Sequence, residues 1–134
     1  MEFKSINKLV LSALVLSSSM SAFANNLLIG APDRCPSIES LRSVEFDSTE
    51  LSEAFPGMWY VMQLNKFYDT NASWDFAILV VAKDEKGSFE RAKEALVTLS
   101  PAPGPRRLDS TLWMCEYQLP SGPEAVAFSH GSTG

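Results

Sequence analysis

The sequence is poor in the residues that enzymes and metal sites use most. It has one histidine, His130, and two cysteines, Cys35 and Cys115, in 134 residues. The two cysteines are too far apart for a C-x-x-C redox motif, a c-type haem attachment site or a paired zinc knuckle. The motifs H-E-x-x-H and G-x-S-x-G, the P-loop and the dinucleotide-binding fingerprint are also absent. We therefore expect a protein that is not an enzyme, with no catalytic residues, no metal site and His130 as a solvated residue near the end of the chain.

Basic residues are scarce, and two of them lie at the N-terminus. Lys4 and Lys8 come before a short apolar run at residues 9–16, and an A-x-A cleavage site ends at Ala24. This is the pattern of a secretory signal peptide over residues 1–24. The apolar run is much shorter than the ~20 residues that span a bilayer. We therefore expect a protein that is exported to the periplasm or secreted, with no transmembrane anchor in the mature chain.

The remaining residues, 25–134, have the length of a single small domain and are acidic. The whole chain has 11 Lys and Arg and 16 Asp and Glu. The leader accounts for Lys4, Lys8 and Glu2, so residues 25–134 keep 9 basic and 15 acidic residues, a net charge of −6. Nucleic acid and anionic membrane surfaces are poor partners for a protein of this charge.

The two cysteines allow one intramolecular disulfide, Cys35–Cys115. An exported protein meets an oxidising compartment, where such a bridge persists. Closing a loop of this length stabilises a fold by about 4 kcal/mol, beside a total stability of about 5–15 kcal/mol for a small domain. Two free thiols or an intermolecular bridge are the alternatives.

Hydrophobic periodicity divides residues 25–134 into helices and strands. Alternation of apolar and polar residues predicts strands, and recurrence every three or four residues predicts helices. We expect a short helix that begins at Pro36, a helix over residues 89–99 with Ser88 as its N-cap, and strands at residues 58–67, 74–83, 110–119 and 124–130, the last at a sheet edge.

These elements predict a fold class. The first two strands should form an antiparallel hairpin, and the second is apolar on both faces in its middle, which suggests that it is covered on both sides. Residues 47–57 read as a polar turn region and residues 100–109 as a stiff proline-rich loop. We therefore predict an α+β two-layer domain over residues 25–134, in which helices pack on one face of an antiparallel sheet of about four strands, with one disulfide.

Several side chains are candidates for holding a ligand. Tyrosine and methionine both serve as axial ligands of haem iron, and tryptophans can line an apolar slot for the porphyrin. These candidates are Tyr60, Tyr68, Tyr117, Met58, Met62, Met114, Trp59, Trp74 and Trp113. Arg106 and Arg107 form a small basic spot that would accept a carboxylate such as a haem propionate. The alternative is that the aromatic residues and methionines fill the core and the two arginines are solvated.

The chain resembles a family of small exported proteins of Legionella and its relatives, some of which are called hemin-binding proteins. The resemblance is carried by "CPSIESL" after the leader, "YDTNASWDF", "RAKEALVTL" and "WMCEY", and it covers Cys35 to Phe128. It implies a periplasmic or secreted protein with hemin as its ligand. It implies no established set of ligand residues, and Tyr68 or Tyr117 would then be the iron ligand.

Two hypotheses of function follow. The first is an exported, non-enzymatic binding protein for which hemin is the ligand, with Tyr68, Tyr117, Trp74, Trp113, Arg106 and Arg107 as candidate site residues. The second is a protein–protein interaction module, either a periplasmic inhibitor or a secreted host-contact factor. In that case the rigid loop at residues 100–109 would make the contact, because a stiff loop loses little entropy on docking.

Overall fold

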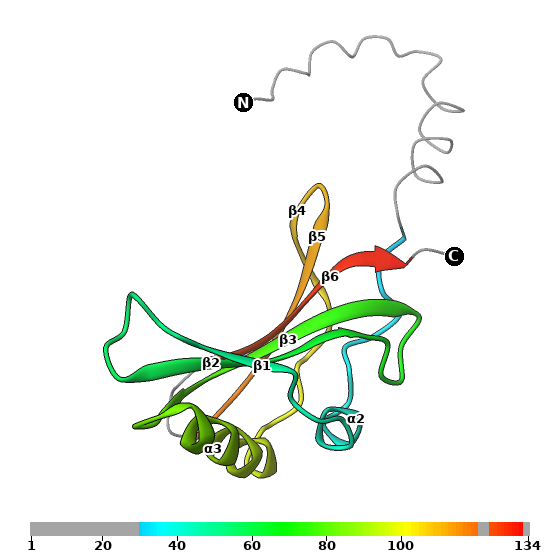
Figure 1. Cartoon of the computed structure of the whole chain (residues 1–134). Coiled ribbons are helices and arrows are strands. Elements are labelled where there is room, and N and C mark those ends of the chain that lie inside the picture. The colour runs from blue at the N-terminus through cyan, green and yellow to red at the C-terminus, as the bar shows by residue number, and fades with distance from the viewer. Residues whose placement is uncertain (1–29, 121–123, 133–134) are drawn as a thin grey trace, which may run out of the picture. The chain divides into compact units, whose positions relative to one another are not determined.

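The computed structural model describes residues 30–120 and 124–132, so the expected leader lies outside the described residues. Within them the elements follow in the order α2 (Ile38–Arg42), β1 (Ser48–Leu51), β2 (Met58–Lys66), β3 (Ala72–Val81), α3 (Glu85–Val97), β4 (Arg106–Asp109), β5 (Leu112–Tyr117) and β6 (Ala125–Ser132). The strands form one antiparallel sheet in the order β1-β2-β3-β6-β5-β4. Both helices lie on one face of the sheet, and the tip of the β4–β5 hairpin extends away from them (Figure 1). The α+β class and the antiparallel sheet are confirmed.

The number of strands was predicted wrongly, because the sheet has six strands rather than about four. The two additional strands are β1 and β4, which lie in the segments that we expected to be a turn region and a loop. Each is four residues long and at least half of it is exposed. Edge strands of this kind carry almost no alternating apolar signal, since neither of their faces is fully buried. They are defined by pairing with β2 and β5.

The position of β6 also differs from the prediction. We expected this strand at an edge, but it lies inside the sheet between β3 and β5. The chain passes from β3 through α3 to the far edge, enters as β4, turns back as β5 and then fills the central position with β6. A sequence pattern reports the burial of a strand and not the order in which strands pair.

The hydrophobic core lies between the sheet and the two helices. Trp74, Phe76 and Ile78 of β3 are all 0% exposed and alternate with residues of the opposite face, as predicted. The core cluster also includes Val61, Val80, Cys115, Tyr117, Ala125 and Ala127 of the sheet and Ala92 and Leu96 of α3. The second face of β3 is not covered by a helix within the described residues, which corrects our expectation that this strand is covered on both sides (Figure 1).

Both helices begin at a polar N-cap. Ser37 caps α2, where its hydroxyl accepts a hydrogen bond from the backbone N–H of Ser40. For α3 the predicted cap, Ser88, is wrong. The helix begins one turn earlier, and the Asp84 carboxylate accepts a 2.7 Å hydrogen bond from the Gly87 N–H. Aspartate is as good an N-cap as serine, so the helix can begin after the earlier residue, Asp84. Ser88 is then buried inside the helix.

The predicted disulfide is confirmed. Cys35 and Cys115 are bonded, with their Cα atoms 5.9 Å apart. The bridge joins the segment before α2 to β5, so it links parts of the chain that are 80 residues apart. Nearby, the Tyr117 hydroxyl donates to the Pro36 carbonyl at 2.5 Å, and an Asp69 carboxylate oxygen accepts from the Ser37 N–H at 3.1 Å. The N-terminal segment is therefore fastened to the sheet both covalently and by hydrogen bonds.

Candidate functional site

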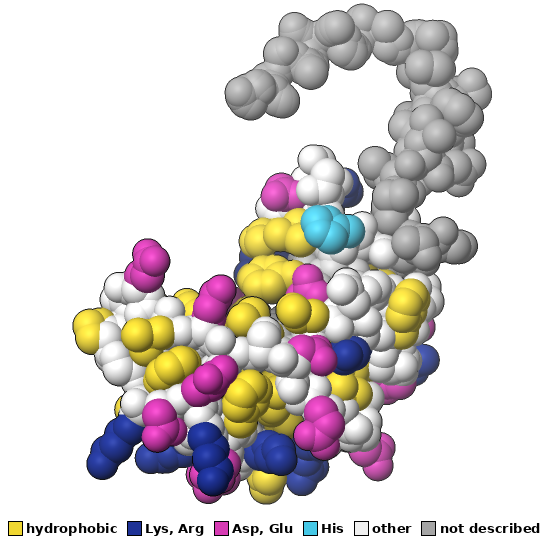
Figure 2. Space-filling model, viewed as in Figure 1, with side chains coloured by type: hydrophobic (Ala, Val, Ile, Leu, Met, Phe, Trp, Pro, Cys, Tyr) yellow, Lys and Arg dark blue, Asp and Glu magenta, His cyan; other side chains and the backbone are white. Residues whose placement is uncertain are grey.

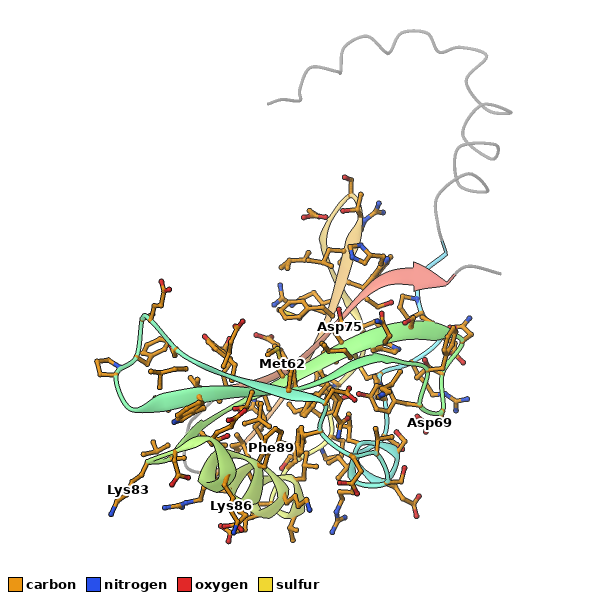
Figure 3. The ribbon with its side chains drawn as sticks, in the orientation of Figure 1. Met62, Asp69, Asp75, Lys83, Lys86 and Phe89 are labelled. Carbon is orange, nitrogen blue, oxygen red and sulfur yellow. A yellow bond between two sulfur atoms is a disulfide. The ribbon has the colours of Figure 1, made fainter. Side chains whose placement is uncertain are left out.

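The sheet face that points away from α2 and α3 is the candidate site, and we call it the open face. Figure 3 shows Met62 and Asp75 on this side of the sheet and Phe89 between α3 and the sheet. Paired residues of antiparallel strands lie side by side on the same face, so the strand register defines rows of side chains across the sheet.

Three rows form the middle of the open face, and the pair Met58 and Val81 lies beyond the first of them. The first runs through Glu50, Tyr60 and Leu79 and ends at Glu124, whose carbonyl accepts a hydrogen bond from the Leu79 N–H. The second row consists of Ser48, Met62, Ala77, Val126 and Glu116. The third row consists of Asp75, Phe128, Met114 and Arg106. The middle of each row is apolar, and each row has a carboxylate at one or both of its ends.

A hollow of about 360 Å³ lies on the open face across the first two rows and Phe128. It is lined by Glu50, Tyr60, Met62, Ala77, Glu124, Val126 and Phe128. Tyr60, Met62, Ala77 and Phe128 are half-buried, so they keep apolar surface in contact with solvent. The volume is at the lower end of the range for ligand sites, about 300–1,000 Å³.

Negative charge surrounds this apolar surface. Glu50 lies at the β1 side, and Glu116 and Glu124 lie at the opposite side. Among the residues placed in the three rows, Arg106 is the only cation, and its guanidinium is 3.2 Å from the Glu116 carboxylate. Figure 2 shows acidic and hydrophobic side chains mixed over the sheet, whereas Lys and Arg gather along the lower edge, over α3. The open face therefore combines an apolar centre with an acidic frame.

Tyr68 and Tyr117, the candidate iron ligands, both belong to hydrogen-bonded networks on the helix side of the sheet. The Tyr68 hydroxyl donates to Gln63 Oε1 at 2.7 Å, and the fully buried Gln63 amide donates to the carbonyls of Leu41 and Val44, both at 2.9 Å. The Tyr117 hydroxyl donates to Pro36 O. Burial raises the pKa of both phenols well above the usual value, and nearby negative charge raises each pKa further. A phenolate ligand to iron would have to overcome both effects.

The remaining candidates are divided between the core and the β4–β5 hairpin. Trp74 is 0% exposed, and its indole N–H donates to Thr70 Oγ1 at 2.8 Å. Trp113 packs beneath the Arg107 guanidinium, whose central carbon is 5.5 Å from the ring centroid. Arg106 is on the open face, on the opposite side of β4 from Arg107. The six candidate residues therefore do not form one site in this structure.

His130 lies on the surface, with Nδ1 3.2 Å from the Thr111 carbonyl oxygen. Over residues 30–120 and 124–132, no group of three or more His, Cys, Asp or Glu side chains could hold a metal ion.

The site residues that sequence reasoning missed are Glu50, Ala77, Glu124, Val126 and Phe128. A signal for two of them was present in β6, where the small Ala125 and Ala127 alternate with the larger Val126 and Phe128. The small residues face the core, so the larger ones are on the open face. An alternation in size alone does not tell which face is covered, because that depends on where α3 packs.

Comparison with known proteins gives no match, whether to a protein-family model, a curated protein sequence or a solved structure. The resemblance to the Legionella family of exported proteins therefore stays a prediction. In the part of the chain that the structure describes, neither helix has the length and apolar character needed to cross a membrane.

The Tyr68–Gln63 network gives a first testable prediction. Replacing Tyr68 by Phe should lower the free energy of unfolding by about 1–3 kcal/mol, because it leaves the buried Gln63 Oε1 without its donor. Urea denaturation followed by circular dichroism measures the change. Tyr60→Phe is the matched control, since no hydrogen bond of the Tyr60 hydroxyl is found among the described residues. It should change stability by less than about 0.5 kcal/mol. Equal effects of the two substitutions would contradict a structural role for Tyr68.

Proposed function

We propose that this chain is an exported, non-enzymatic binding protein that recognises a protein partner through the open face. The observation that carries the proposal is the apolar hollow on the side of the sheet that no described helix covers, where Tyr60, Met62 and Phe128 are half-buried and Val126 is buried. A contiguous apolar surface with a polar frame is typical of interaction sites. Export is supported by the leader pattern of residues 1–24 and by the Cys35–Cys115 disulfide.

The chemistry of the hollow supports binding rather than catalysis. Its lining residues include no Ser, Thr, Cys, His or Lys side chain. A Ser, Thr, Cys or Lys nucleophile activated by an adjacent base is therefore not available among these residues, and the lining groups with a reactive oxygen are Glu50, Glu124 and Tyr60. The two lining carboxylates, Glu50 and Glu124, stand at opposite ends of one row, on either side of Tyr60 and Leu79. Carboxylates on both sides of an apolar surface are suited to pairing with cations of a partner.

Hemin is the second candidate ligand, and the observation that favours it is the position of Tyr60 and Met62 in the same hollow. A phenol and a thioether are both known ligands of haem iron, and Phe128 offers an aromatic ring beside them. The charge of the open face argues against hemin, because its propionates would meet Glu50 and Glu124. Arg106, the cation among the residues of the three rows, already pairs with Glu116. We therefore favour a protein partner, and we no longer assign the iron to Tyr68 or Tyr117.

Site-specific photo-crosslinking tests the proposal. A photoreactive residue at position 62, on the open face, should give one discrete protein adduct in the producing cell or its medium, and the partner is then identified and purified for binding. The same residue at position 97, an exposed site on α3, is the matched control and should give none. The adduct should also disappear when Phe128 is replaced by Ser. An adduct at position 97 and none at position 62 would overturn the proposal.

A hemin titration of the purified protein separates the two candidate ligands. We expect no saturable shift of the Soret band beyond that of an unrelated acidic protein. A stoichiometric shift that is lost in Tyr60→Phe or Met62→Ala would replace the protein partner by hemin. Tyr68→Phe, on the other side of the sheet, is the control that should leave such a shift unchanged.

A further inference from the structure

We propose that the partner segment on the open face is a basic, amphipathic α-helix. This inference rests on the proposed function and names the chemistry of the partner. It predicts that an apolar stripe of the helix covers the middle of the three rows, while Lys or Arg residues on both flanks of the stripe reach Glu50 on one side and Glu116 and Glu124 on the other.

The dimensions of the apolar surface match one helix. Successive rows are two residues apart along a strand, so three rows extend over about 14 Å, the length of about nine helical residues. In the first row the apolar side chains lie on β2 and β3, and in the second row they lie on β2, β3 and β6. In the third row β3 carries Asp75, and the apolar side chains lie on β6 and β5. The distance from β2 to β6 is two strand spacings, about 10 Å, and a helix with its side chains is about 10–12 Å wide.

The charges then define the flanks of the helix. Glu50 belongs to β1, one strand beyond the apolar surface, and Glu116 belongs to β5 on the opposite side. A helix that lays its apolar stripe on the sheet places its flanking side chains above these carboxylates, so cations on both flanks are favoured. Residues 25–134 carry a net charge of −6, which has the same sign as these carboxylates. This net charge would speed the association with a basic partner.

The same features disfavour other occupants of the face. A second copy of this chain would bring one acidic frame against another. An extended peptide that adds a strand would pair with the backbone of β1 or β4 at the sheet edges, and it would leave the open face uncovered. The test must therefore distinguish a helix on the face from a strand at the edge and from self-association.

The probe is a synthetic helical peptide of about 18 residues, long enough to be helical, with a leucine stripe flanked by lysines. Two matched peptides have glutamate in place of lysine, or the same composition in scrambled order. Fluorescence anisotropy with the purified protein should show saturable binding of the basic amphipathic peptide that weakens as salt is added. The acidic and scrambled peptides should bind at least about tenfold more weakly, a difference of about 1.4 kcal/mol.

Charge variants locate the contact. Glu50→Gln combined with Glu124→Gln should weaken binding of the basic peptide by about three- to tenfold, as expected for two exposed ion pairs. Glu90→Gln combined with Glu94→Gln on α3 removes the same charge from the helix side of the sheet and should have no effect. Amide chemical-shift changes should map to β2, β3 and β6.

Each contrary result has a distinct meaning. Equal binding of the acidic peptide, or shift changes confined to α3 or to the edge strands β1 and β4, would overturn the basic helix while leaving the proposed function in place. A dimer detected by sedimentation, with the open face buried between the two copies, would overturn the basic helix in favour of self-association. A missing photo-crosslink at position 62, in contrast, overturns the proposed function itself.

Discussion

Replacing Cys35 and Cys115 together by alanine should lower the free energy of unfolding by about 4 kcal/mol. The disulfide closes a loop of 80 residues, so its removal greatly increases the conformational freedom of the unfolded chain. In the folded state, Cys115 is 0% exposed and belongs to the core cluster. Alanine fits both positions without leaving a buried polar group. A loss of this size is a large part of the stability of a small domain, about 5–15 kcal/mol.

Urea denaturation of the oxidised protein and of the double variant measures this effect. Dithiothreitol should destabilise the wild type by a similar amount and leave the double variant unchanged. A difference below about 1 kcal/mol would contradict the prediction, since a bridge over so long a loop should contribute several times more. It would mean that the Tyr117–Pro36 and Asp69–Ser37 hydrogen bonds are enough to hold the N-terminal segment.

Replacing Trp74 by alanine should lower the free energy of unfolding by about 3–5 kcal/mol. Trp74 is a fully buried side chain in the middle of the core cluster, where truncation leaves a cavity that the neighbouring strands cannot close. Its indole N–H also donates to Thr70 Oγ1 in the turn between β2 and β3, so the substitution removes one end of a hydrogen bond as well. The large effect follows from burial and does not depend on any ligand.

Equilibrium denaturation with a matched control tests this prediction. Phe67→Ala removes an aromatic side chain that is 53% exposed, and it should cost less than about 0.5 kcal/mol. If Trp74→Ala were as mild as the control, the placement of Trp74 in the core would be wrong. A hydrophobic slot that holds a ligand through this residue would then become the better explanation.

The strongest predictions from the sequence concerned parts of the chain that are buried on one side. The alternation of Trp74, Phe76 and Ile78 with less buried residues identified the core face of β3, because a period of two on a half-buried strand leaves few other interpretations. The disulfide was predictable because two cysteines permit one intramolecular bridge. The short helix was predictable from its apolar residues, but its start was not, because it begins at Ile38 after the Ser37 cap and not at Pro36.

The missed elements had no such signal. β1 and β4 are short and largely exposed, and they become strands only because β2 and β5 offer them backbone partners. Gln63 was not expected in the core, since its amide finds partners in the carbonyls of Leu41 and Val44, at and beyond the end of α2. Contacts between distant segments cannot be read from local periodicity.

The candidate site shows the same division. The sequence alone determined that this chain has few groups suited to catalysis, an acidic balance and strands that are rich in aromatic residues and methionine. Only the tertiary structure decided which of these side chains meet. Both faces of β2 carry apolar residues, Trp59 and Val61 on one and Tyr60 and Met62 on the other, so hydropathy does not separate them. The face on which α3 packs became the core, and the opposite face kept a hollow that no described helix covers.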